Sequence, residues 1–316
     1  MKYIITDRRC GLGDAILNLA ASWYLARQHN CGVIVDWRRL PYTIINEETF
    51  ERHNLNLYNS IFKLPPSIEG ITFHLPEEFP DVFMGPKTKD GHPYDLDHLP
   101  CIEQDEKEIS TVLSHLDNSN FIRTSMRFGQ ANKIYPAMRR VTNPRFNYYN
   151  FFCQIPLHQS IQDDIKEFTD YAINERTVAI HFRHGNGETI MGRGANWISC
   201  EEGVQEIKEE AEKFLSGKLE DYNYCIFSDT PKAEKLLLDA FPNSYCKPKT
   251  LPPEGSGGVH FSTELNPILS FQESIKDMYL MAACSYILWT QHSTFSLPAR
   301  HIIDPQKQHM LFEIKK

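Results

Sequence analysis

The chain has 316 residues, of which 41% are hydrophobic, 12% aromatic and 23% charged. This composition is typical of a soluble globular protein with a sizeable core, and it excludes a disordered, collagen-like or coiled-coil chain. At roughly 150 residues per domain, the length predicts about two domains. Lys and Arg number 33 and Asp and Glu number 41, which gives a net charge of −8. A mildly acidic chain without a basic tail argues against nucleic acid as the main partner, because phosphate backbones select for clustered cations.

The amino-terminal residues lack the long apolar region of a signal peptide, and no window of about 18 apolar residues predicts a membrane span. The eight cysteines are scattered, without a CxxC pair or a Cys/His metal spacing. This pattern is typical of reduced thiols rather than of a disulfide framework. We therefore expect a cytoplasmic protein without an integral membrane segment.

The first 36 residues predict a β-loop-α-β unit of the kind that builds a parallel sheet. Residues 3–6 form an apolar strand, and Gly11-Leu12-Gly13 leads into a helix over 14–29 with Asp14 as its N-cap. The stretch from Gly32 to Asp36 predicts the second strand. Residues 40–150 contain many prolines and short aromatic runs, from which we expect irregular structure with short helices.

An alternation of strands and helices returns in the second half, after a helix over 160–174. Strands are predicted at 177–182, 222–228 and 285–290, and helices at 201–215, 231–240, 271–283 and 293–301. We expect two α/β domains, 1–168 and 169–300, followed by a tail over 301–316.

Polar residues follow each predicted strand of the second domain, at the sheet edge where open parallel sheets bind ligands. Arg183 follows the first strand, Asp229 the second, and Ser293 begins the helix after the third. A guanidinium group forms bidentate hydrogen bonds to phosphate oxygens, and hydroxyls at a helix N-terminus supply neutral donors. The set therefore suits a nucleoside diphosphate.

The glycine loop at Gly11 and Gly13 is similar to a dinucleotide-binding fingerprint, but Ile16 occupies the position of its third glycine. It predicts either a tight turn or a backbone close to a ligand. Asp95 and Asp97 have the spacing of metal-binding carboxylates in some glycosyltransferases, but no strand precedes them. We predict no metal site.

One segment, VAIHFRHGNGETIMGRGANW at 178–197, strongly resembles the central motif of the nodulation α-1,6-fucosyltransferases, the NodZ family. Three further segments resemble the same family in the same order: RRCGLGDAILNLAASWYLA with VDWR, CIFSDT at 225–230, and DMYLMAACSYILWTQHSTF at 277–295. Together they cover about a quarter of the chain, whereas residues 40–165 show no such match.

This resemblance implies an α/β protein of the GT-B fold, with two Rossmann-like domains facing across a cleft. The carboxyl-terminal domain would bind GDP-fucose, and the amino-terminal domain would bind an oligosaccharide or glycan acceptor. Transfer would be inverting and independent of metal or any cofactor. The acceptor atom would be the 6-hydroxyl of an N-acetylglucosamine.

The resemblance also assigns roles to residues. Arg183 would hold the donor pyrophosphate, Asp277 would recognise guanine, and Glu188, the nearest carboxylate in the motif, would be the catalytic base. If Glu188 is not the base, His184 and Asp14 are the next candidates from their chemistry. The donor-site residues would be His181, Arg183, Ser228, Asp229, Asp277, Ser293, Thr294, Gly11, Gly13 and Arg9.

Three other functions stay open from the sequence. A GT-B transferase could use another GDP-sugar, since the assigned residues would bind the GDP part of the donor rather than the fucose. An NAD-dependent oxidoreductase could use the glycine loop, although Ile16 disfavours it. A non-catalytic module would bind GDP without turning over a donor.

Overall fold

The computed structural model describes two α/β units, Met1–His158 and Gln159–Lys316. The residues it describes are 1–46, 51–52, 54–83, 95–103, 106, 108–126, 144–185, 199–290, 293–302 and 310–314. Within these ranges, no helix combines the length and the apolar character needed to cross a bilayer.

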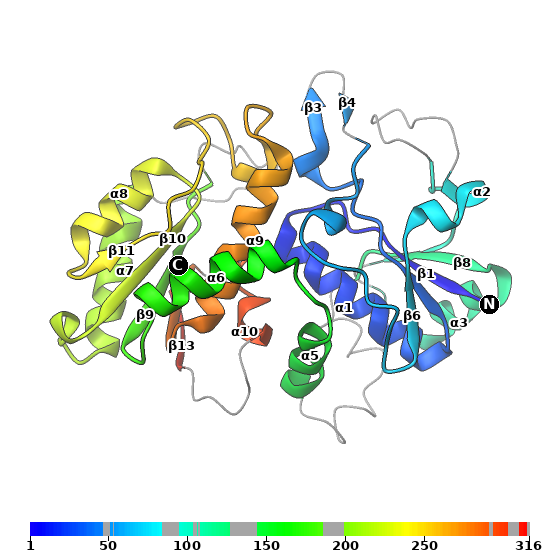
Figure 1. The fold of residues 1–316 in the computed structure, drawn as a ribbon, viewed down its shortest axis with the longest axis horizontal. Coiled ribbons are helices and arrows are strands. Elements are labelled where there is room, and N and C mark those ends of the chain that lie inside the picture. The colour runs from blue at the N-terminus through cyan, green and yellow to red at the C-terminus, as the bar shows by residue number, and fades with distance from the viewer. Residues whose placement is uncertain are drawn as a thin grey trace. The chain divides into compact units, whose positions relative to one another are not determined.

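The amino-terminal unit is built on a six-stranded sheet in the order β5-β6-β2-β1-β8-β7. Figure 1 labels β6, β1 and β8 of this sheet. Its strands pair in parallel, except that β5 and β6 are antiparallel. From β1 the strand order runs to one side through β2 and β6, and to the other side through β8 and β7. The topological switch point of this sheet therefore lies between β1 and β8. The elements are β1 (Tyr3–Thr6), α1 (Leu12–His29), β2 (Gly32–Ile34), β3 (Ile44–Asn46), β4 (Glu51–Arg52), β5 (Ser67–Ile68), β6 (Ile71–His74), α2 (Pro80–Phe83), β7 (Cys101–Ile102), α3 (Ile109–Asn118), β8 (Phe121–Thr124) and α5 (Pro144–Cys153).

Helix α1 packs along β1 and β2 and is buried from Leu12 to Ala26. Apolar or small residues occur on all sides of this helix, which is the pattern of a buried helix rather than of a surface helix with one hydrophobic stripe. The helix begins after Gly11 and ends at Asn30, whose left-handed backbone turns the chain into β2. The predicted cap was wrong: Asp14 lies in the first turn, where its carboxylate pairs with Arg8 at 3.3 Å.

The carboxyl-terminal unit has a five-stranded parallel sheet in the order β11-β10-β9-β12-β13. Counted along the chain, this is the 3-2-1-4-5 order of a Rossmann sheet, and its switch point lies between β9 and β12. The elements are α6 (Gln159–Ala172), β9 (Thr177–Phe182), α7 (Cys200–Phe214), β10 (Asn223–Ser228), α8 (Pro231–Ala240), β11 (Ser244–Tyr245), α9 (Pro267–Ala283), β12 (Tyr286–Thr290), α10 (Ala299–Ile302) and β13 (Met310–Ile314).

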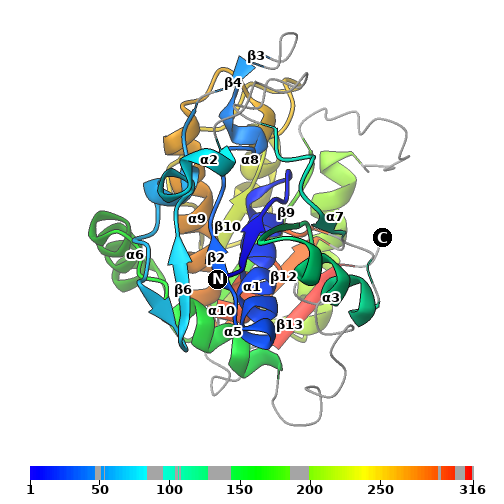
Figure 2. The ribbon, with the colours of Figure 1, turned by 90° about the vertical axis from the view of Figure 1, so that its right-hand side faces the viewer.

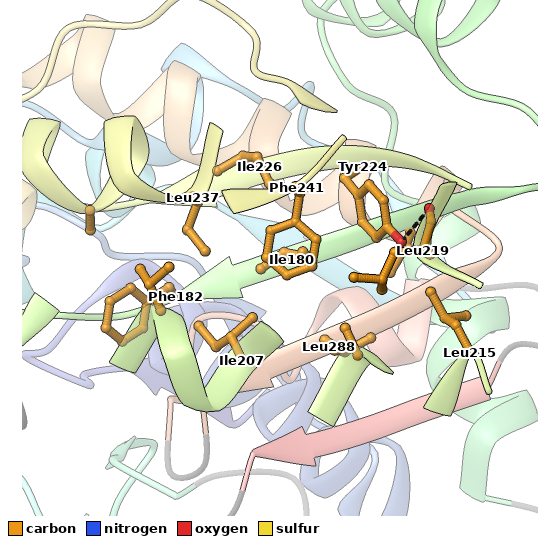
Figure 3. Packing of buried hydrophobic residues seen from close by; sticks show 14 of the residues in the cluster. Ile180, Phe182, Ile207, Leu215, Leu219, Tyr224, Ile226, Leu237, Phe241 and Leu288 are labelled. Carbon is orange, nitrogen blue, oxygen red and sulfur yellow. Dashed lines mark hydrogen bonds between the residues drawn. The ribbon is translucent and has the colours of Figure 1, made fainter. Parts of the chain in front are cut away.

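The two faces of this second sheet are covered by different helices (Figure 2). Alternate residues of β9, namely Val178, Ile180 and Phe182, pack with α7 and α8 in one hydrophobic cluster. Figure 3 shows this cluster, in which the buried hydroxyl of Tyr224 donates to the Leu219 carbonyl at 2.9 Å. Helix α9 packs with α6 and α10 on the other face. The intervening positions of β9, including His181, therefore point away from the α7–α8 cluster.

The sequence predicted the α/β elements of the second unit closely, with three differences. The predicted helix over 293–301 is wrong for most of its length: only Ala299–Ile302 is helical, because Pro298 disfavours helical geometry before it. The boundary placed at 168 falls inside α6, whose Asp164 pairs with Lys247 and Lys276 of the carboxyl-terminal unit. The stretch over 301–316, expected as a tail, contains β13, which pairs with β12.

Leu237 on α8 tests the importance of the α7–α8 core, because its side chain is completely buried in the cluster. We expect Leu237→Ala to lower the free energy of unfolding by about 2–5 kcal/mol, from lost burial and the cavity left behind. Urea denaturation measures this loss. Leu238→Ala, on the same helix but only partly buried, is the matched control. Equal losses in the two variants would contradict the assigned core.

Candidate active site

Three strands of the carboxyl-terminal sheet bring their carboxyl ends together at the switch point. Arg183 follows β9, Asp229 follows β10, and Thr290 ends β12. The backbone amide of Arg183 donates to the Thr290 hydroxyl at 3.0 Å, and the Nη1 atom of the Arg183 side chain donates to the Asp229 carboxylate at 3.0 Å. These two bonds join the ends of the three strands.

Asp229 fixes the turn that follows β9. Its carboxylate accepts hydrogen bonds from the backbone amides of His184 and Gly185, both at 2.9 Å, in addition to the bond from Arg183. Gly185 has a φ of +91°, a conformation that glycine adopts without steric cost. Only 10% of the Asp229 side chain is exposed, whereas 21% of the Arg183 side chain remains accessible. The hydrogen bond to Asp229 thus fixes the guanidinium group, and part of the Arg183 side chain stays accessible to a ligand.

His181 is a buried neutral imidazole beside this arginine. Its ring lies 5.3 Å from the ring of Phe295, and its Nδ1 has no hydrogen-bond partner among the residues that the structure describes. Burial lowers the pKa of His181 to about 3, an effect that Asp229 opposes and Arg183 increases. At neutral pH this residue therefore offers polar ring nitrogens rather than a positive charge.

Asp277, assigned to guanine recognition, forms a buried ion pair on α9. Its Oδ2 lies 2.6 Å from the Nζ of Lys249, which belongs to the loop after β11. Burial raises the pKa of the Asp277 carboxyl, and the Lys249 ammonium opposes that rise. The pair carries no net charge when both groups are ionised, so it can present a neutral polar surface to a ligand.

Three predicted donor-site residues have structural environments that the sequence did not anticipate. Ser293 is buried, and its amide donates to the Thr290 carbonyl at 3.2 Å. Because no helix begins at Ser293, neither it nor Thr294 has the helix N-terminus that the sequence argument gave them. The Ser228 hydroxyl lies within 3.5 Å of both the amide nitrogen and the carbonyl oxygen of Thr230, inside the turn that leads into α8.

The structure adds residues that the sequence argument missed. His260 lies on the short helix Val259–Phe261, and burial together with nearby Arg183 lowers the pKa of its imidazole. Lys249, Thr290 and Phe295 were also missed. The signal for His260 was weak: it follows the glycine-rich stretch over 254–258, which the sequence marked only as a loop.

Three of the remaining predicted residues lie in the other unit. Arg9, Gly11 and Gly13 belong to the amino-terminal unit, where Gly11 precedes α1 and Arg9 bonds to Asp97 at 2.7 Å. Glu188, the predicted catalytic base, lies outside the described residues. The next candidate, His184, is held by its backbone amide, and its Nδ1 makes no hydrogen bond within the part of the chain that is described.

Two α/β units, each built on a largely parallel sheet, are the architecture of the GT-B class of fold. Solved structures agree: an α-1,6-fucosyltransferase NodZ crystal soaked with GDP-fucose matches 96% of this chain and 92% of its own, with a TM-score of 0.62 and 18% identity. A mutant of Arabidopsis thaliana FUT1 in complex with GDP matches all of this chain and 71% of its own, with a TM-score of 0.57 and 11% identity.

The family model for nodulation protein Z (NodZ) matches residues 1–308. Nodulation protein Z of Bradyrhizobium diazoefficiens is 25% identical over 91% of this chain and 75% of its own length. The Sinorhizobium fredii protein of the same name is 21% identical over 94% of this chain and 91% of its own. The chain therefore belongs to the nodulation protein Z family, which confirms the resemblance seen in its motifs.

The low pKa of His181 gives the stability of this protein a defined pH dependence. An unfolded histidine titrates near 6.5, so between pH 6.5 and about 3 the unfolded chain binds a proton that the folded chain does not. The free energy of unfolding should fall as the pH drops through this window. We expect wild type to lose about 2 kcal/mol more than His181→Gln between pH 7.5 and pH 5.

Urea denaturation at the two pH values measures this difference. His98→Gln, which replaces an exposed histidine, is the control and should follow wild type. Parallel losses in wild type and His181→Gln would mean that His181 is not held neutral by burial.

Proposed function

We propose that this protein transfers fucose from GDP-fucose to a sugar hydroxyl, with inversion and without a metal ion. The observation that carries the proposal is the anchored guanidinium of Arg183 at the switch point of the carboxyl-terminal sheet. Membership of the nodulation protein Z family supports it, since solved NodZ structures are described as α-1,6-fucosyltransferases, in crystals with GDP or soaked with GDP-fucose.

The chemistry of the reaction explains why an anchored arginine is needed. As the bond between the sugar and the diphosphate breaks, negative charge grows on the departing GDP. Donors that are already oriented stabilise that charge without having to reorganise during the reaction. Asp229 holds the Arg183 guanidinium in place, and neutral His181 lies beside it without adding charge. We propose that Arg183 binds the diphosphate and that this fixed geometry replaces a metal ion.

An inverting transfer also needs a base to take the proton of the acceptor hydroxyl as that oxygen attacks the sugar from the face opposite GDP. Glu188 remains the proposed base on the strength of its motif. His184 is the second candidate, because its backbone is fixed by Asp229 while its Nδ1 makes no hydrogen bond in the described ranges. Asp14 is a poorer candidate than the sequence suggested, since it pairs with Arg8.

The acceptor and the cellular location are also part of the proposal. We propose the 6-hydroxyl of an N-acetylglucosamine in a chito-oligosaccharide or glycan, bound through the amino-terminal unit, because the family includes α-1,6-fucosyltransferases. The cytoplasm is the proposed location on the basis of the scattered cysteines.

Transfer from another GDP-sugar is the second candidate function. The features around Arg183 and Asp277 suit the nucleoside diphosphate of the donor rather than its sugar.

Arg183→Ala should lower the rate of GDP release from GDP-fucose by about 10²–10³-fold, because the departing diphosphate loses an oriented donor. Arg183→Lys should also be strongly impaired, since an ammonium group cannot reproduce the planar bidentate geometry. The measurement is the initial rate with chitotetraose as acceptor. Arg176→Lys, at an exposed position just before β9, is the control and should keep wild-type activity. Near wild-type turnover by Arg183→Lys would contradict the assignment.

Thermal stability tests the proposed donor without requiring the acceptor. In EDTA, GDP at 100 times its dissociation constant should raise the free energy of unfolding by roughly 2.7 kcal/mol, because it binds only the folded chain. UDP and NAD at the same concentration should have much smaller effects. Stabilisation by NAD but not by GDP would overturn the transferase proposal in favour of an oxidoreductase that uses the glycine loop.

A further inference from the structure

Three arginines share two carboxylates at the carboxyl edge of the amino-terminal sheet. Asp7 lies 3.5 Å from Arg9, 3.3 Å from Arg39 and 2.8 Å from Arg123. Asp97 contacts the same three side chains at 2.7, 3.6 and 2.9 Å. We call these five residues the arginine cluster.

The topology of the sheet explains why these side chains meet. Asp7 and Arg9 follow β1, Arg39 follows β2, and Arg123 lies on β8 beside β1. Neighbouring arginines have carboxylate partners outside the cluster: Arg8 pairs with Asp14 at 3.3 Å, and Arg38 pairs with Asp36 at 3.0 Å and with Glu77 at 3.9 Å. Among the described residues, the arginine cluster therefore joins three cations to two carboxylates at the switch point between β1 and β8, where open sheets bind ligands.

Arg39 is the member whose environment is incomplete. Only 3% of its side chain is exposed, and none of its three guanidinium nitrogens makes a hydrogen bond within the part of the chain that the structure describes. Its two ion pairs, at 3.3 and 3.6 Å, are not hydrogen bonds. A buried charged donor left without hydrogen bonds is costly, so such groups commonly mark ligand sites.

The cluster also has an exposed side. The Arg9 side chain is 30% exposed and that of Asp97 is 56% exposed. Two residues after Arg9, the N-terminus of α1 has no side-chain cap, and a Cβ atom added at Gly11 would meet nothing within 4 Å. Open space at an uncapped helix N-terminus favours an anion.

We propose that the arginine cluster binds an oxyanion carried by the acceptor, so that the preferred acceptor is an acidic rather than a neutral oligosaccharide. This inference rests on the proposed function and deepens it. It assigns Arg9 to the acceptor, whereas the sequence suggested the donor. The ligand oxygens would complete the hydrogen bonds of Arg39 and match the third positive charge. Sulfate, phosphate and carboxylate groups share this chemistry.

The test compares two acceptors of the full-length chain: chitotetraose, and chitotetraose with one sulfate on its non-reducing sugar. In wild type, we expect the sulfated acceptor to have a KM about ten-fold lower, which is the gain from roughly one charge-assisted hydrogen bond. Arg9→Gln should lose this preference, with its KM values for the two acceptors becoming equal. Arg39→Gln should do the same if it folds. Arg27→Gln is the control and should keep the preference. Arg27 is an exposed arginine near the C-terminal end of α1, and it pairs with Glu69.

Two results would overturn the proposal. Equal KM values for the two acceptors in wild type would mean that the cluster is only structural. A loss of GDP stabilisation in Arg9→Gln would mean that the cluster serves the donor diphosphate instead.

If neither acceptor is fucosylated, the proposed function fails while this inference can still be tested. Calorimetric titration of both tetrasaccharides into the chain then decides it: tighter binding of the sulfated one supports the anion site, and equal binding rejects it.

Discussion

The carboxylate of Asp229, at the end of β10, is the constraint on which the candidate active site depends. Three donors are ordered around it: the guanidinium of Arg183 and the backbone amides of His184 and Gly185. Because these donors share one carboxylate, the turn after β9 and the direction of Arg183 are set together. The three hydrogen bonds satisfy both oxygens of this largely buried carboxylate. It thereby makes the arginine a fixed donor and not a mobile surface charge.

The two units use one architectural principle with different electrostatics. Both place polar side chains beyond the carboxyl ends of parallel strands, at the point where the strand order reverses. In the carboxyl-terminal unit, one arginine is balanced by one aspartate and lies near neutral imidazoles. In the amino-terminal unit, three arginines share two aspartates. Two sheets of the same class can therefore favour different ligands through the number of charges at their edges.

The sequence predicted the second unit well because its elements carry strong local signals. The strand over 177–182 is a fully buried, largely apolar run, and the helix at Cys200–Phe214 has clear amphipathic spacing and a capping box at Ser199. The strands of the first unit beyond β2 are two to four residues long, which is too short for a periodic signal. Arg183 and Asp229 could be predicted because they directly follow strong strands. Lys249 and His260 lie outside such strands, where only the folded chain brings them to Asp277 and Arg183.

The local charges near the switch point of the second sheet indicate which group meets the diphosphate. The Lys249 ammonium is 2.6 Å from the Asp277 carboxylate, so its charge is already matched within the protein. His181 is neutral because burial opposes its protonation, and the same holds for His260. Arg183 also has a carboxylate partner, but 21% of its side chain is exposed, whereas Lys249 exposes only 8%. Of these described groups, a ligand can therefore best reach the positive charge on the planar Arg183 guanidinium, whose orientation is fixed by Asp229.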